Sequence, residues 1–204
     1  MPPNPTAVAE TRSRIHASAL ELFTKRGFHG TGMRQIARGA EVSLGNLYNH
    51  HKTKKALFAA LLEEYEAEYT APDTPLAKAL ASFKDLSDLE RIGEASRAMI
   101  RRFSPYIRLI YVDLVELEGG HIRRLFGGMR QRYEEQLGER LQKLRDEGLL
   151  GDVDPITGLM TATISYFYLF NIQQIFGVTK LYGVSDKQAI HDIAEIFRWG
   201  LEPR

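Results

Sequence analysis

Side chains that can bind a charged partner are concentrated near the N-terminus. Between Arg12 and Phe58 the sequence has nine Lys and Arg residues and two acidic ones, a net charge of +7, while the remainder has a net charge of −6. Four of the six histidines lie in the same stretch. Such an asymmetry on a nearly neutral chain indicates a polyanionic partner, although a solvated basic face would give the same pattern.

Composition excludes several other kinds of chemistry. The 204 residues include no cysteine, which rules out disulfides and thiolate metal sites. No phosphate-binding glycine loop and no G-x-S-x-G motif is present, so we expect no catalytic residues, no metal ligands and no cofactor. The Pro-rich segment Met1–Glu10 lacks the apolar centre of a signal peptide. We expect residues 1–10 to be a disordered tail on a cytoplasmic protein.

The elements that position the basic residues are predicted to be helices throughout. No stretch shows sustained alternation of apolar and polar residues, whereas apolar residues recur at helical spacing, and the hydrophobic fraction of 44% supports a sizeable core. The sequence therefore predicts an all-α fold. The expected helices cover residues 11–26, 33–39, 44–50, 53–69, 76–84, 89–103, 105–116, 121–147, 155–176 and 186–201.

Two of these helices are short and joined by the four-residue turn 40–43, which is the organisation of a helix-turn-helix. Ser43 is well suited to cap the second of them. A helix that enters the major groove of DNA by its N-terminal end must be short and braced by a neighbour. We therefore expect a helix-turn-helix DNA-binding domain over residues 11–56, the fourth helix (about 53–69) as a linker, and a second helical domain over 70–204.

The same stretch resembles the TetR (TetR/AcrR-type) family of bacterial transcriptional regulators. The resemblance covers about Arg12 to Tyr65 and keeps the family's order and spacing without gaps. The matching residues are Ala19-Leu20-Glu21-Leu22-Phe23, Arg26-Gly27-Phe28, Thr31, Ile36-Ala37, Val42-Ser43, Gly45, Leu47-Tyr48, His50, Lys54 and Leu57-Phe58. The resemblance implies a transcription regulator, usually a repressor, that binds double-stranded DNA at a palindromic operator as a homodimer and responds to a small-molecule effector.

The resemblance also assigns roles within the motif. Tyr48 and Lys54 occupy positions that meet the DNA backbone, where Lys54 would be helped by a helix N-terminus. Asn46, at the start of the third helix, would face the bases and can pair bidentately with adenine. The residues expected to contact DNA are Thr31, Arg34, Ser43, Leu44, Gly45, Asn46, Tyr48, His50 and Lys54.

Four residues depart from the family pattern. Glu41 stands where the turn usually has glycine, which implies either a different turn or about 1 kcal/mol of strain. Leu44 replaces a frequent lysine, His51 replaces an aromatic residue that packs under the motif, and Lys55 stands where an acid is common.

The last two helices are predicted to form the dimer interface. Ile156–Phe176 holds 21 residues without a formal charge, but its Thr, Ser, Asn and Gln residues and the lack of aromatic belts argue against a membrane span. Burial against both its own core and a partner subunit explains the segment better. The final helix, with Phe197 and Trp199, is the natural second half of this interface.

Aromatic residues in the middle and late helices permit an apolar effector pocket, although ordinary core packing would also account for them. The candidate ligand-binding residues are Arg102, Phe103, Tyr106, Asp113, Phe126, Tyr133, Tyr166, Phe170, Asn171 and Gln174. The ligand would be an apolar or aromatic small molecule that lowers the affinity for DNA. Two alternatives stay open: a helical enzyme, and a non-specific basic binder of nucleic acid or membrane surfaces.

Overall fold

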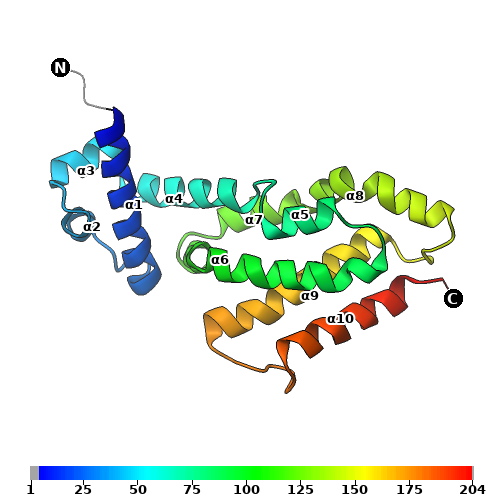
Figure 1. Ribbon diagram of the computed structural model, residues 1–204. Coiled ribbons are helices and arrows are strands. Elements are labelled where there is room, and N and C mark those ends of the chain that lie inside the picture. Colours follow the sequence, from blue (N-terminus) through cyan, green and yellow to red (C-terminus); the bar gives the residue numbers. More distant parts are fainter. Residues whose placement is uncertain (1–4, 204) are drawn as a thin grey trace. The chain divides into compact units, whose positions relative to one another are not determined.

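The computed structural model describes residues 5–203, and all its regular elements are helical, which confirms the all-α prediction (Figure 1). The elements are α1 (Pro5–Arg26), α2 (Met33–Gly39), α3 (Leu44–His50), α4 (Lys54–Tyr69), α5 (Pro75–Ala81), the 3-10 helix η1 (Leu86–Asp88), α6 (Leu89–Glu116), α7 (Gly120–Gly127), α8 (Met129–Asp146), α9 (Pro155–Phe176) and α10 (Asp186–Leu201). No helix in the described part of the chain is long and apolar enough to cross a membrane.

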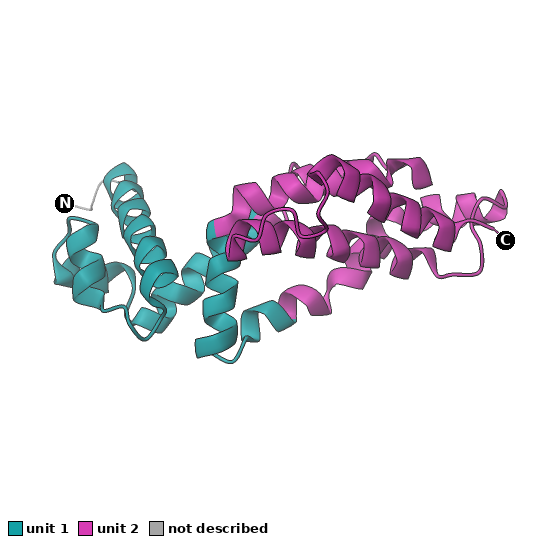
Figure 2. Cartoon of the chain, turned by 90° about the horizontal axis from the view of Figure 1, so that it is seen from below, with its two compact units in different colours: residues 1–68, 105–123 teal, residues 69–104, 124–204 magenta. Residues whose placement is uncertain are grey.

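The helices form two compact units (Figure 2). Unit 1 comprises residues 1–68 and 105–123, and unit 2 comprises residues 69–104 and 124–204. The predicted division at residue 70 therefore misses one feature, because the end of α6 and the start of α7 pack with the N-terminal helices. That association depends on contacts distant in sequence, which periodicity does not reveal.

Unit 1 is held together by an aromatic and aliphatic core. The rings of Phe23 and Phe58 meet edge-on at 5.1 Å, and Phe28 lies 5.8 Å and 5.5 Å from them. Ile36 of α2 and Leu47 of α3 are fully buried. Helices of seven residues are not stable alone in water, so α2 and α3 depend on this core. Each buried side chain of this size contributes about 1.5–3 kcal/mol.

Unit 2 is organised around α9, which packs against both α8 and α10. Asp154 caps α9, and Gly177 ends it in a left-handed conformation at φ +74°. The buried Tyr166 hydroxyl donates to the Ile190 carbonyl at 3.1 Å and so ties α9 to α10.

Three helix predictions are corrected. Residues 5–10 continue α1 instead of forming a disordered tail, since Ala7 to Glu10 favour helix and Pro5 is tolerated in a first turn; residues 1–4 lie outside the described part. The predicted helix 121–147 is broken at Gly127–Gly128. The predicted helix 76–84 ends at Ala81, before η1.

The two helices predicted over 89–103 and 105–116 form one helix with a kink. Phe103 has non-helical angles of φ −105° and ψ 18°, and Pro105, inside the helix, has no N–H to donate. The kink lies where the chain passes from unit 2 to unit 1.

Candidate nucleic-acid interface

The turn between α2 and α3 keeps a left-handed residue despite the missing glycine. Glu41 has φ +56°, and its backbone N–H donates to the Arg38 carbonyl at 3.2 Å. Of the two possibilities left by the sequence, the structure therefore has the strained one, since an L-residue in this region costs about 1–2 kcal/mol. The predicted N-cap is confirmed, because the Ser43 hydroxyl accepts from the Asn46 N–H at 3.1 Å.

Helix α3 presents one side to solvent and buries the other. Leu47 is fully buried, whereas Tyr48 is 40% exposed although its ring is large. Gly45 is exposed, and the nearest atom that an added Cβ would meet is the Ser43 hydroxyl, 4.0 Å away. Crowding within the chain does not require glycine there, so the position is open to a close approach from outside.

Four other predicted DNA contacts lie on α2 and α3. Asn46, Leu44 and His50 are half-buried, whereas Arg34 on α2 is exposed. These side chains come from two helices that pack against each other. Their role in reading DNA stays a prediction.

Two predicted phosphate ligands, Lys54 and Thr31, make hydrogen bonds within unit 1. The Lys54 ammonium donates to the carbonyls of Phe28 at 2.7 Å and Thr31 at 2.8 Å, and lies 4.4 Å from the centroid of the Phe28 ring. One of its three N–H groups is left for a phosphate. Thr31 is 1% exposed and its hydroxyl donates to the Gly27 carbonyl, so we do not propose a phosphate contact for it.

His51 belongs to a polar cluster that replaces the expected aromatic packing. His16 Nε2 lies 3.1 Å from His51 Nε2, and His16 Nδ1 lies 2.5 Å from a Glu64 carboxylate oxygen. Burial lowers the pKa of His51, and the charges of His16, His50 and Arg12 lower it further. The only sequence signal for this cluster is that His51 replaces the usual aromatic residue. That signal does not predict its contacts with His16 or the involvement of Glu64.

The ten predicted ligand residues are divided between the two units. Tyr106 and Asp113 belong to unit 1, where the Tyr106 hydroxyl lies 2.6 Å from His121 Nε2 and an Asp113 carboxylate oxygen accepts from the His121 N–H. Their polar groups therefore stabilise the α6–α7 turn. The other eight belong to unit 2, but three are exposed there: Arg102, Phe126 and Gln174.

Five of the candidates are buried in unit 2: Phe103, Tyr133, Tyr166, Phe170 and Asn171. The phenol of Tyr166 is used in the bond to α10. Tyr133 differs, because its buried hydroxyl has no hydrogen bond of ordinary geometry. Burial raises the pKa of Tyr133 to about 12, an effect moderated by the neighbouring Thr163.

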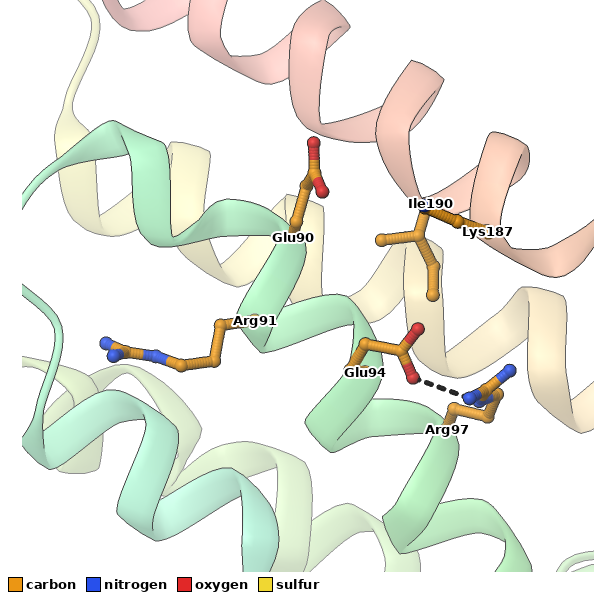
Figure 3. Close-up of a pocket in the computed structure, with 6 residues that line it drawn as sticks. All are labelled: Glu90, Arg91, Glu94, Arg97, Lys187 and Ile190. Carbon is orange, nitrogen blue, oxygen red and sulfur yellow. Dashed lines mark ion pairs between the residues drawn. The ribbon is translucent and has the colours of Figure 1, made fainter.

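An open pocket of about 530 Å³ lies between α6 and α10 (Figure 3). It is lined by Glu90, Arg91, Glu94, Arg97, Lys187 and Ile190. Figure 3 shows Arg97 paired with Glu94, at 2.7 Å. This groove contains none of the predicted ligand residues, and five of its six lining residues carry a charge. No group of three or more metal-ligating side chains occurs in residues 5–203.

Comparison with known proteins agrees with this geometry. The sequence profile described as bacterial regulatory proteins of the tetR family matches residues 15–61. The HTH-type transcriptional regulator RutR of Escherichia coli K12 is 26% identical over 97% of this chain and 93% of its own length. UidR of the same strain, also an HTH-type transcriptional regulator, is 39% identical over 57 residues, which are 28% of this chain and 29% of UidR.

The fold is also similar to a solved structure. A TetR family transcriptional regulator from Chloroflexus aurantiacus superposes with a TM-score of 0.66 at 18% identity and covers 96% of this chain and 95% of its own. The matched proteins are transcription regulators, which confirms the interpretation as a regulator and not an enzyme. Regulators of this family bind DNA and small-molecule effectors and act as dimers. Residues 15–61 match the tetR family, and the chain is similar over nearly its whole length to transcriptional regulators of the helix-turn-helix type, which supports a DNA-binding transcriptional regulator.

Proposed function

We propose that this protein is a homodimeric repressor that binds a palindromic operator through α3 and leaves it when a small apolar or aromatic ligand binds. The observation that carries the proposal is the open side of α3, where Gly45, Asn46 and Tyr48 are presented on a helix anchored by the buried Leu47. The surrounding net charge of +7 supplies attraction to phosphates.

Selection of DNA sequences tests the operator part. A random-sequence duplex library is enriched on the unsubstituted protein, and the affinity of the selected duplex is compared with that of a shuffled duplex by fluorescence anisotropy over a salt series. We expect a palindromic sequence whose half-sites are about one helical turn apart. A protein that enriches no sequence at low salt would contradict the proposal and favour a non-specific basic binder.

Apolar side chains on α9 and α10 support the dimer. Tyr168 is 56% exposed, Ile196 68% and Trp199 76%, and Ile196 and Trp199 are three residues apart, on one side of α10. Large apolar side chains exposed on adjacent helices are typical of association surfaces. We therefore assign the interface to these two helices.

Light scattering with size exclusion tests this assignment. Trp199→Glu is expected to convert the dimer to a monomer, because a charge would be buried without a partner. Leu149→Glu is the matched control, since Leu149 is also exposed, at 51%, but lies outside both helices. A Trp199→Glu protein of unchanged mass would contradict the assignment.

Tyr133 supports an effector site inside unit 2. An unpaired buried hydroxyl costs about 1–3 kcal/mol, and a ligand with a hydrogen-bonding group would offset this cost. An aromatic pair occurs in the same unit, where the rings of Tyr69 and Phe103 meet edge-on at 5.3 Å. Aromatic walls and one polar group are typical of sites for flat, largely apolar ligands.

A thermal-shift panel of phenols and aromatic acids tests the effector site. Tyr133→Phe is expected to fold about as stably as the unsubstituted protein, because no hydrogen bond of ordinary geometry is lost and the contact with Thr163 is weak, but to lose the shift caused by the best compound. Tyr166→Phe is the control, and it should lower stability while leaving the ligand response. Equal responses of Tyr133→Phe and the unsubstituted protein would exclude Tyr133 as a ligand contact.

A further inference from the structure

The last residue of α6 binds the turn that leads into the helix-turn-helix. One carboxylate oxygen of Glu116 accepts from the Phe28 N–H at 3.1 Å, and the other accepts from the His29 N–H at 2.7 Å. The partners are 88 and 87 residues apart in sequence, but all of them lie in unit 1. The contact therefore joins two separate segments of one compact unit through both oxygens of a single side chain.

The turn is shaped to admit this carboxylate. Gly27 has φ +73°, and a Cβ added to it would lie 2.1 Å from Glu116 Oε1. A side chain at position 27 would thus collide with the carboxylate as well as strain the backbone. Lys54 binds the same turn on its carbonyl side. Glu116 therefore accepts from two N–H groups of residues 27–31, and Lys54 donates to two of their carbonyls.

The position of Glu116 is unfavourable for the helix that carries it. A negative charge in the last turn of a helix opposes the helix dipole. Two backbone N–H donors compensate for this, since hydrogen bonds to a charged group are among the stronger ones. The contact with the turn therefore explains an acid at the end of α6, which helix preferences do not.

The turn bound by Glu116 and Lys54 leads directly into α2, the first helix of the helix-turn-helix. Thr31 is buried at its end, Gly32 is the N-cap of α2, and α2 packs against α3. On the other side, residues 105–116 form a continuous helical segment that starts at the kink of α6. A displacement of this segment moves the Glu116 carboxylate, and with it the start of α2.

We propose that Glu116 is a positioning residue for DNA recognition, which links the end of α6 to the reading helices by holding the Phe28 and His29 amides. This inference rests on the proposed function, because it concerns the affinity for the operator. The link between α6 and the reading helices thus consists of the Glu116 side chain and the turn at residues 27–31.

Glu116→Gln tests the inference, because the amide keeps the size of the side chain but turns one acceptor into a donor. Glu118→Gln, two residues away, makes the same charge change on an exposed side chain and is the control. Hydrogen exchange should accelerate at Phe28 and His29 only in Glu116→Gln. Affinity for the selected operator should fall about tenfold, the effect of losing a charged hydrogen bond.

Two further readouts separate positioning from general damage or a lost phosphate contact. Affinity for a shuffled duplex and the salt slope should not change, since no phosphate contact is removed. Gly27→Ala supplies a second variant that acts on the same contact. In a double-mutant cycle on operator affinity, Glu116→Gln should cost much less in the Gly27→Ala background, because the contact is already broken.

The outcomes are distinguishable. Unchanged operator affinity or unchanged exchange in Glu116→Gln would overturn the role of Glu116 and leave the proposed function intact. Additive effects in the cycle would also overturn it. A protein that selects no operator would instead overturn the proposed function, while exchange at Phe28 and His29 would still report on the contact.

Discussion

Replacing Glu41 by glycine is expected to stabilise the protein at its DNA-reading turn. Glu41 has φ +56°, a conformation that costs an L-residue about 1–2 kcal/mol and glycine almost nothing. Glycine loses about 0.5–1 kcal/mol through the greater freedom of the unfolded chain. The Glu41 side chain is exposed, so little else changes. The difference predicts a gain of about 0.5–1 kcal/mol in the free energy of unfolding.

Urea denaturation at pH 7.5 measures this gain, and two variants isolate its cause. Glu41→Asn should give part of the gain, because asparagine tolerates the left-handed region. Glu41→Gln removes the charge but not the strain, and should leave stability within about 0.5 kcal/mol. A Glu41→Gly protein less stable than the unsubstituted one would refute the reasoning, since the entropy of glycine would then outweigh any relief of strain.

Three further predictions concern stability. Because the pKa of His51 is lowered from 6.5, the unfolded state binds more protons below about pH 6.5, so stability should fall from pH 7.5 to 5.5, and less steeply in His51→Phe. Asp154→Ala should cost about 1 kcal/mol at pH 7 by removing the cap of α9. The pKa of Asp154 is lowered to about 2, chiefly by the Thr157 hydroxyl and then by Arg130. The difference in stability between Asp154→Ala and the unsubstituted protein should therefore shrink only as the pH falls below about 4. Gly93→Ala should cost about 1–3 kcal/mol, because its Cβ would lie 2.8 Å from Ile190 Cγ2 and 2.9 Å from Tyr166 Cε1. Urea denaturation over pH 2–8 checks all three, and a flat pH profile for the unsubstituted protein between pH 5.5 and 7.5 would contradict the first.

The local elements of the reading domain were predictable because their signals are local. The bounds Met33–Gly39 and Leu44–His50 agree with the structure, since a cap at Ser43 and regularly spaced apolar residues define them. The cost of Glu41 was predictable for the same reason. What a turn residue does to its own backbone depends on its neighbours in sequence.

The rest depends on contacts between distant segments. Thr31 looks like a phosphate ligand in the sequence but is buried against Gly27, and no local pattern distinguishes the two. In the sequence Glu116 cannot be distinguished from an ordinary surface acid. Its role follows only from the structure, in which it accepts from the Phe28 N–H. The predicted effector residues are aromatic residues and a few polar ones on the same helices, and residue type alone does not separate core packing from a binding site.

The affinity of Asn46→Ala for the selected operator tests the central claim most directly. Asn46 is half-buried in the first turn of α3, and the loss of a bidentate base contact costs about 1–3 kcal/mol. We predict that the ratio of affinities for selected and shuffled duplexes falls at least fivefold, while Asn49→Ala, the same change on an exposed residue of the same helix, leaves it within twofold. An unchanged ratio in Asn46→Ala, together with an unchanged ratio in Tyr48→Ala, would contradict the assignment of α3 as the helix that reads DNA.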